Sequence, residues 1–91
     1  MTDSATKFPI IRTAGLDGML VTFADQLSEP SNRATLAFCE AVKSCAWPGV
    51  QEVSTSLASV FLRFDGAVLR HDALKDLLWD LLEQQDWQRA P

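Results

Sequence analysis

The first candidate for acid–base or metal chemistry in this sequence is its only histidine, His71. No cysteine or second histidine stands at a metal-ligand spacing from His71. A catalytic base also needs polar partners that converge on the same substrate, and none is indicated by the neighbouring sequence. We therefore expect His71 to cap or flank a helix start at the surface, with no metal and no catalytic role.

The two cysteines, Cys39 and Cys45, fall in one helical pattern. Their separation of six helical residues corresponds to a rise of about 9 Å, whereas a disulfide needs Cα atoms within about 7 Å. These thiols therefore cannot pair within that helix, and a reactive thiol would need a base or cation to lower its pKa. Cys45 lies on the apolar stripe and is expected in the core. Cys39, between Phe38 and Glu40, is expected to be partly exposed.

Three aspartates, Asp72, Asp76 and Asp80, recur every four residues and so share one side of a helix. We interpret this row as a solvated helix face opposite a stripe of leucines. Gly15 and Gly18 precede a predicted strand rather than a helix, so they do not form a phosphate-binding loop. The sequence therefore predicts no catalytic, cofactor-binding or metal-binding residue.

Hydrophobic periodicity predicts the elements that position these residues, in the order β-β-α-β-β-α. Alternating or β-branched runs indicate strands, and apolar residues spaced i, i+3, i+4, i+7 indicate helices. Ser28 is the predicted N-cap of the first helix, and Trp47-Pro48-Gly49 is its predicted end. The predicted strands cover residues 8–11, 19–24, 50–55 and 59–64, and the second helix begins near residue 70 or 71. We predict an α+β fold of two layers, with a four-stranded antiparallel sheet and two helices on one face.

Length and composition fit one small globular domain. The chain has 91 residues, 47% hydrophobic and 22% charged, which are ordinary globular values. We expect the domain at residues 8–87, between a flexible N-terminal tail at 1–7 and a short tail at 88–91. A net charge of −4 with scattered basic residues disfavours nucleic-acid binding. No stretch predicts a membrane span or a signal peptide, and unpaired thiols suit a reducing compartment, so we expect a cytoplasmic protein.

Three strings of the sequence, taken in order, resemble one known family. They are AG followed by GMLVTFAD at residues 14–15 and 18–25, WPGVQEV at 47–53, and SVFLRFD at 59–65. On these strings the chain resembles the N-terminal domain of the family that contains allophanate hydrolase subunit 1, the corresponding 5-oxoprolinase subunit and the Kip-type kinase inhibitor. The resemblance covers about residues 8–87. Leu16 departs from the family's Asp, and Thr55-Ser56-Leu57 from its common Pro-Ala-Tyr.

This resemblance implies a fold like that of pterin dehydratase (DCoH-like), followed in the full-length family protein by a cyclophilin-like C-terminal domain. It also implies partnership with a second subunit in ATP-coupled hydrolysis of an amide or lactam, with no cofactor bound by this segment. In the Kip-type member it implies binding to a bacterial histidine kinase. Our leading expectation is a non-catalytic interaction domain of a hydrolase subunit. The alternatives are a stand-alone regulator of a kinase or other protein, and a small enzyme in its own right.

The sheet face that points away from the helices is the part of the predicted fold most suited to a partner. An apolar patch on such a face, which would otherwise meet water, marks an interaction surface more often than scattered exposed residues do. The neighbour would be another domain, a second protein or a second copy of the chain. Scattered surface apolar residues are the alternative. The predicted interface residues are Leu20, Val53, Phe61 and Arg63, with Trp79 and Trp87 as further candidates.

Overall fold

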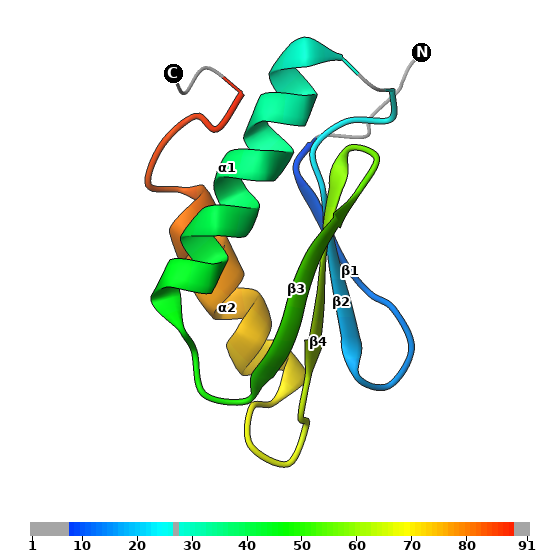
Figure 1. Ribbon diagram of the computed structural model, residues 1–91. Coiled ribbons are helices and arrows are strands. Elements are labelled where there is room, and N and C mark those ends of the chain that lie inside the picture. The colour runs from blue at the N-terminus through cyan, green and yellow to red at the C-terminus, as the bar shows by residue number, and fades with distance from the viewer. Residues whose placement is uncertain (1–7, 27, 89–91) are drawn as a thin grey trace, which may run out of the picture.

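The computed structural model describes residues 8–26 and 28–88, so the expected tail at 1–7 and residues 89–91 lie outside the described residues. The predicted order of elements is confirmed (Figure 1). The strands are β1 (Ile10–Thr13), β2 (Gly18–Thr22), β3 (Val50–Ser56) and β4 (Ser59–Phe64), and the helices are α1 (Glu29–Cys45) and α2 (His71–Leu82). Among the described residues, no helix combines the length and apolarity needed to cross a membrane.

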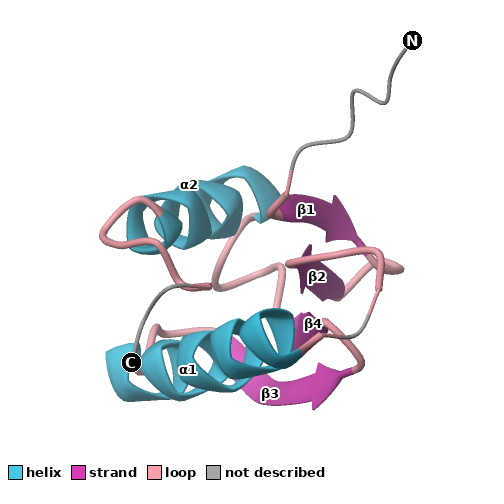
Figure 2. Cartoon of the chain, turned by 90° about the horizontal axis from the view of Figure 1, so that it is seen from above, coloured by secondary structure: helices cyan, strands magenta, loops and turns pink. Residues whose placement is uncertain are grey.

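The four strands form one antiparallel sheet in the order β1-β2-β4-β3. Both helices lie side by side on one face of this sheet, and α1 packs on β3 and β4 (Figures 1 and 2). The predicted two-layer α+β fold is therefore confirmed. The opposite face of the sheet is covered by no described element, and we refer to it as the open face.

Alternate residues of the two central strands supply the sheet's part of the core, as the period of two along a strand requires. Leucines of α2 and aromatic residues of α1 and the C-terminal segment fill the other side. The fully buried core side chains of the strands and α2 are Met19, Val21, Val60, Leu62, Phe64, Leu74 and Leu78.

A pair of serines fixes the first turn of α1. The backbone N–H of Ser31 donates to Ser28 Oγ over 3.2 Å, and the backbone N–H of Ser28 donates to Ser31 Oγ over 3.0 Å. This reciprocal arrangement satisfies two N–H groups at the helix start, and it confirms Ser28 as the N-cap. The helix ends at Cys45, and its C-cap Ala46 has a left-handed backbone with φ of 50°, just before the predicted Trp47-Pro48-Gly49 stop.

The start of β1 lies two residues after the predicted position. Pro9 carries no backbone N–H, so it cannot donate to the ladder, and pairing begins at Ile10 opposite Thr22. The strand remains at the edge of the sheet, as Pro9 led us to expect.

The placement of Val53 on the open face was wrong. Val53 lies directly opposite Leu62 in the β3–β4 ladder, so it points towards the helices and packs against the core. The cause is a bulge between Val50 and Glu52, which inserts one residue and reverses the alternation along β3. Val50, Val53 and Thr55 therefore share the helix-facing side, and Glu52 turns to the open face.

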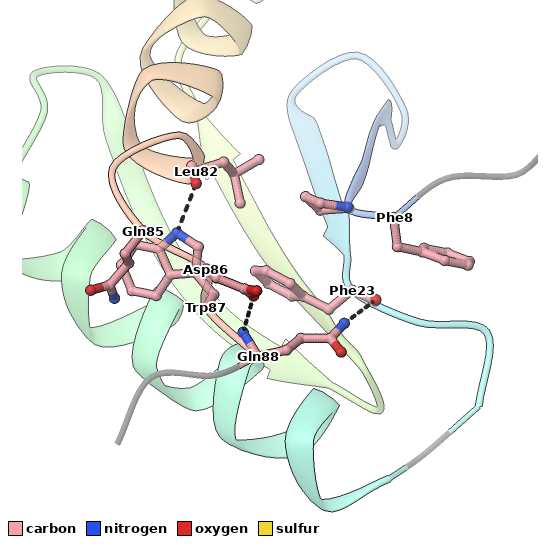
Figure 3. A pocket seen from close by; sticks show the side chains of 8 residues that line it. Phe8, Phe23, Leu82, Gln85, Asp86, Trp87 and Gln88 are labelled. Carbon is pink, nitrogen blue, oxygen red and sulfur yellow. Dashed lines mark hydrogen bonds between the residues drawn. The ribbon is translucent and has the colours of Figure 1, made fainter.

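The segment after α2 folds back onto the core, so the prediction of Trp87 as a partner contact was also wrong. Trp87 is buried, and its ring lies edge-on to Phe38 with the centroids 5.1 Å apart. Its indole N–H donates to the carbonyl oxygens of Leu81 and Leu82, which allows a polar ring to be buried. Gln88 donates from Nε2 to the carbonyl oxygen of Phe23 over 2.9 Å, so packing extends one residue past the expected end of the domain (Figure 3).

Candidate functional site

The residues first considered for chemistry are spread over the molecule. In residues 8–26 and 28–88, no group of three or more His, Cys, Asp and Glu side chains could hold a metal ion. Asp72, Asp76 and Asp80 are exposed along α2, which matches their interpretation as a solvated face. His71 packs edge-on against the ring of Phe64, with the centroids 4.8 Å apart. The structure thus uses His71 for packing at the start of α2.

The two thiols are free, but their environments are the reverse of those we expected. Cys39 is buried and Cys45 is exposed. The buried side of α1 includes two polar residues, Ser31 and Thr35, and the hydroxyl of Thr35 can be buried because it donates to the carbonyl oxygen of Ser31 over 2.8 Å. Ser31, Thr35 and Cys39 follow one another at intervals of four residues, so the buried side of α1 is wider than its apolar stripe and includes Cys39. Cys45 is the last residue of α1, and its side chain there is exposed to solvent.

Burial is the main reason that the pKa of the Cys39 thiol lies above its ordinary value of 9.0. The carboxylate of Glu40 raises this pKa further, and the ammonium group of Lys43 opposes the rise. Cys39 therefore stays protonated near neutral pH, where a thiol is a poor nucleophile.

A cavity of about 310 Å³ lies where the C-terminal segment passes the start of β1 (Figure 3). Its lining residues are Phe8, Pro9, Phe23, Leu82, Gln85, Asp86, Trp87 and Gln88. Several of its polar groups already bond to one another, since Asp86 Oδ1 accepts from the backbone N–H of Gln88 and Gln88 Nε2 donates to Phe23. A second cavity of about 220 Å³ lies between the end of α1 and β3. Neither lining set contains a Ser, Thr, Cys or His side chain.

The open face carries the most distinctive cluster of side chains. Leu20 of β2 and Phe61 of β4 are directly opposite each other, and both are half-buried. The Phe61 ring lies over Gly18, because a Cβ added to Gly18 would stand 2.9 Å from Phe61 Cε1. The missing side chain at Gly18 therefore lets an aromatic ring lie down on the sheet. Leu20 and Phe61 occupy the face that we predicted for them.

The charged residues on the open face are mainly basic. Arg63 Nη2 lies 3.4 Å from Glu52 Oε1, and both side chains are about half exposed. Arg12 lies opposite Leu20 at the β1 edge, is exposed, and makes no ion pair with a described residue. An ion pair as exposed as that of Arg63 and Glu52 contributes little to stability, about 0–1 kcal/mol. These arginines are therefore available to interact with groups outside the chain.

Comparison with known proteins places this geometry in a family. Residues 9–91 match the family described as the carboxyltransferase domain, subdomains C and D. The chain belongs to this family. No curated protein matches the chain at a significant level.

Solved structures related to this carboxyltransferase-domain chain share its fold. A conserved uncharacterized protein from Pyrococcus horikoshii superimposes with a TM-score of 0.78 at 20% identity, covering 82% of this chain and 35% of that protein. The urea carboxylase of Kluyveromyces lactis superimposes with a TM-score of 0.62 at 24% identity, covering 81% of this chain and 7% of that enzyme. The urea amidolyase from the same organism gives 0.63 at 24% identity, covering 81% of this chain and 4% of that enzyme. The chain thus spans about a third of the first protein and a small part of the other two.

Proposed function

We propose that this chain is a non-catalytic docking domain of a carboxyltransferase-domain protein related to allophanate hydrolase subunit 1 and to the corresponding 5-oxoprolinase subunit. The observation that carries the proposal is the open face, where Leu20 and Phe61 form an apolar centre that no described element covers. Family membership supports it, because the structural relatives continue well beyond the part that this chain matches.

The reaction of the complete assembly would be an ATP-coupled conversion of an amide, a lactam or a urea-type substrate. This substrate class is supported by the urea carboxylase and urea amidolyase that share the fold and by the resemblance of the three sequence strings. The described residues contribute no nucleophile–base pair, so this domain would hold a neighbouring domain or second subunit in place. Leu20, Phe61 and Arg63 would then make the contact.

Replacing Phe61 with Asp tests the proposal, since the exposed edge of the ring is lost and a carboxylate enters the apolar centre. We expect Phe61→Asp to abolish co-purification with the second subunit of the proposed complex and to lower ATP-dependent turnover of allophanate, 5-oxoproline or urea by that complex. Leu36→Asp is the matched control, because Leu36 is a leucine exposed on α1 on the other side of the molecule. Circular dichroism checks that both variants remain folded.

Unchanged co-purification and turnover for a folded Phe61→Asp variant would contradict the proposal. The alternative, a Kip-type regulator, predicts a different readout from the same proteins. In that case the wild-type chain would inhibit autophosphorylation of a histidine kinase, and its removal would leave amide turnover unaffected.

A further inference from the structure

The apolar centre of the open face, Leu20 and Phe61, spans the two central strands, and Ile10 of β1 lies on the same face in the next row, opposite Thr22. One row across the sheet runs from Arg12 on β1 through Leu20 on β2 and Phe61 on β4 to Ser54 on β3. Neighbouring strands are about 4.8 Å apart, whereas an α-helix with its side chains is about 10 Å across. A single helix lying on β2 and β4 would therefore cover Leu20 and Phe61. A second sheet would also bury the polar residues of both edge strands, which costs free energy unless each finds a hydrogen bond.

The charges around this centre indicate what must flank the apolar side of such a helix. Arg12 lies beside Leu20 at the β1 edge, and Arg63 lies two residues beyond Phe61 along β4, opposite Gly18. Glu52 is the one acidic residue of the four strands on this face. Two arginines and one glutamate give this face a charge of about +1, in a chain with a net charge of −4. Complementary potentials favour a partner with carboxylates at these places.

A second copy of this chain does not meet these requirements. A symmetric face-to-face pair would bring two positively charged faces together. The acidic helix α2 carries Asp72, Asp76 and Asp80, but its apolar stripe is already buried in the core through Leu74 and Leu78. The occupant must therefore come from a different chain or domain.

We propose that the open face binds one amphipathic α-helix of a partner protein, with its apolar side on Leu20 and Phe61 and with acidic residues beside Arg12 and Arg63. The inference rests on the proposed function, because it specifies the kind of partner that the docking domain takes. In this arrangement, Arg12 and Arg63 determine the specificity for the partner, and Leu20 and Phe61 supply the apolar contact that contributes to affinity.

Site-specific photo-crosslinking tests which segment lies on the open face. The chain is produced in its native host with p-benzoylphenylalanine in place of Leu20, and in a parallel sample in place of Leu36 on α1. We expect the residue-20 probe to crosslink a helical segment whose apolar residues recur at i, i+3, i+4 and i+7 and are flanked by Asp or Glu. Crosslinks into a strand, a basic helix or a second copy would overturn the helix inference while leaving a docking function in place. Equal, non-specific labelling from both positions would overturn the proposed function itself.

Charge reversal tests the electrostatic part with two defined peptides. Both are amphipathic helices with a leucine stripe, flanked by glutamates in one and by lysines in the other. Each exposed ion pair is worth up to about 1 kcal/mol, so we expect the wild-type chain to bind the glutamate peptide about five to tenfold more tightly. The Arg12→Glu, Arg63→Glu double variant should prefer the lysine peptide, whereas Arg33→Glu on α1 should leave the preference unchanged.

Nuclear magnetic resonance titration locates the peptide on the surface. The expected amide shifts cluster on Gly18–Thr22 of β2 and Ser59–Phe64 of β4, and they weaken as salt is added, since exposed charges are screened over about 10 Å at 0.1 M. Equal binding of the two peptides, or shifts confined to the helix layer, would overturn the inference.

Discussion

Cys39 and Cys45 lie on the same helix but differ in exposure, and this difference can be measured. We expect a thiol reagent such as 5,5′-dithiobis(2-nitrobenzoic acid) to modify Cys45 rapidly in the folded protein, because Cys45 is exposed. Cys39 should react only on unfolding, since it is buried and its pKa is raised. The native protein should thus show one fast thiol, and Cys45→Ser should remove it. Two fast thiols in the folded wild type would show that Cys39 does not lie on the buried side of α1.

Gly18 lets the Phe61 ring lie close to the backbone on the open face. A methyl group at this position would collide with the carbonyl oxygen of Ala14 and stand 2.9 Å from the Phe61 ring. We expect Gly18→Ala to lower the free energy of unfolding by about 1–3 kcal/mol, which is the usual cost of overpacking. Gly66→Ala is the matched control, because a Cβ at Gly66 meets nothing within 4 Å. Urea denaturation of both variants measures the difference, and equal stabilities would argue against the placement of the Phe61 ring.

Among the helices and strands, α1 depends on the serine pair at its start. Ser28→Ala removes the oxygen that accepts from the Ser31 N–H, so we expect a loss of about 1 kcal/mol in the free energy of unfolding. Ser44→Ala, on an exposed turn of the same helix, should change stability by less than about 0.5 kcal/mol. Thermal unfolding followed by circular dichroism compares the two. A Ser28→Ala variant as stable as the wild type would mean that water replaces the cap without cost.

Most elements could be predicted because each has a local signal that tertiary packing did not override. These signals are the alternation around Val21 and Val60 in the central strands, the serine cap at residue 28 of α1 and the regularly spaced leucines of α2. The errors arose where the decisive interaction is not local. The β3 bulge depends on pairing with β4, so nothing near Val53 in the sequence shows which way it points. A spacing of three residues between Val50 and Val53 was the one available hint, since both fit the same face only if a bulge lies between them.

The candidate site was predictable in part for the same reason. Leu20 and Phe61 alternate with core residues in regular strands, so their orientation follows from the pattern. Their direct pairing, and the ring lying over Gly18, depend on the β2–β4 register, which links residues about 40 positions apart and leaves no local signal. The burial of Trp87 likewise requires the chain to turn back after α2, and the polar residues around Gln84 and Gln85 indicated only that the helix ends.

For the molecule as a whole, Trp87 ties the C-terminal segment to α1 and to the end of α2. We expect Trp87→Ala to lower the free energy of unfolding by about 3–5 kcal/mol, because a buried aromatic ring and its hydrogen bonds are lost. Trp79→Ala provides the control, since Trp79 is 38% exposed on α2 and should cost much less. Chemical denaturation monitored in the far ultraviolet measures both. Similar losses for the two variants would contradict the central position assigned to Trp87.

The bulge in β3 has a consequence for the chain at high concentration. β3 is an edge strand, and a regular edge of seven residues can template continuous pairing between molecules. The bulge twists this edge, and the exposed Gln51 and Glu52 beside it add polarity and charge. β1, at the other edge, has only four residues. We therefore expect the chain to resist fibril growth along its strand edges, even though Leu20 and Phe61 remain partly exposed on the open face.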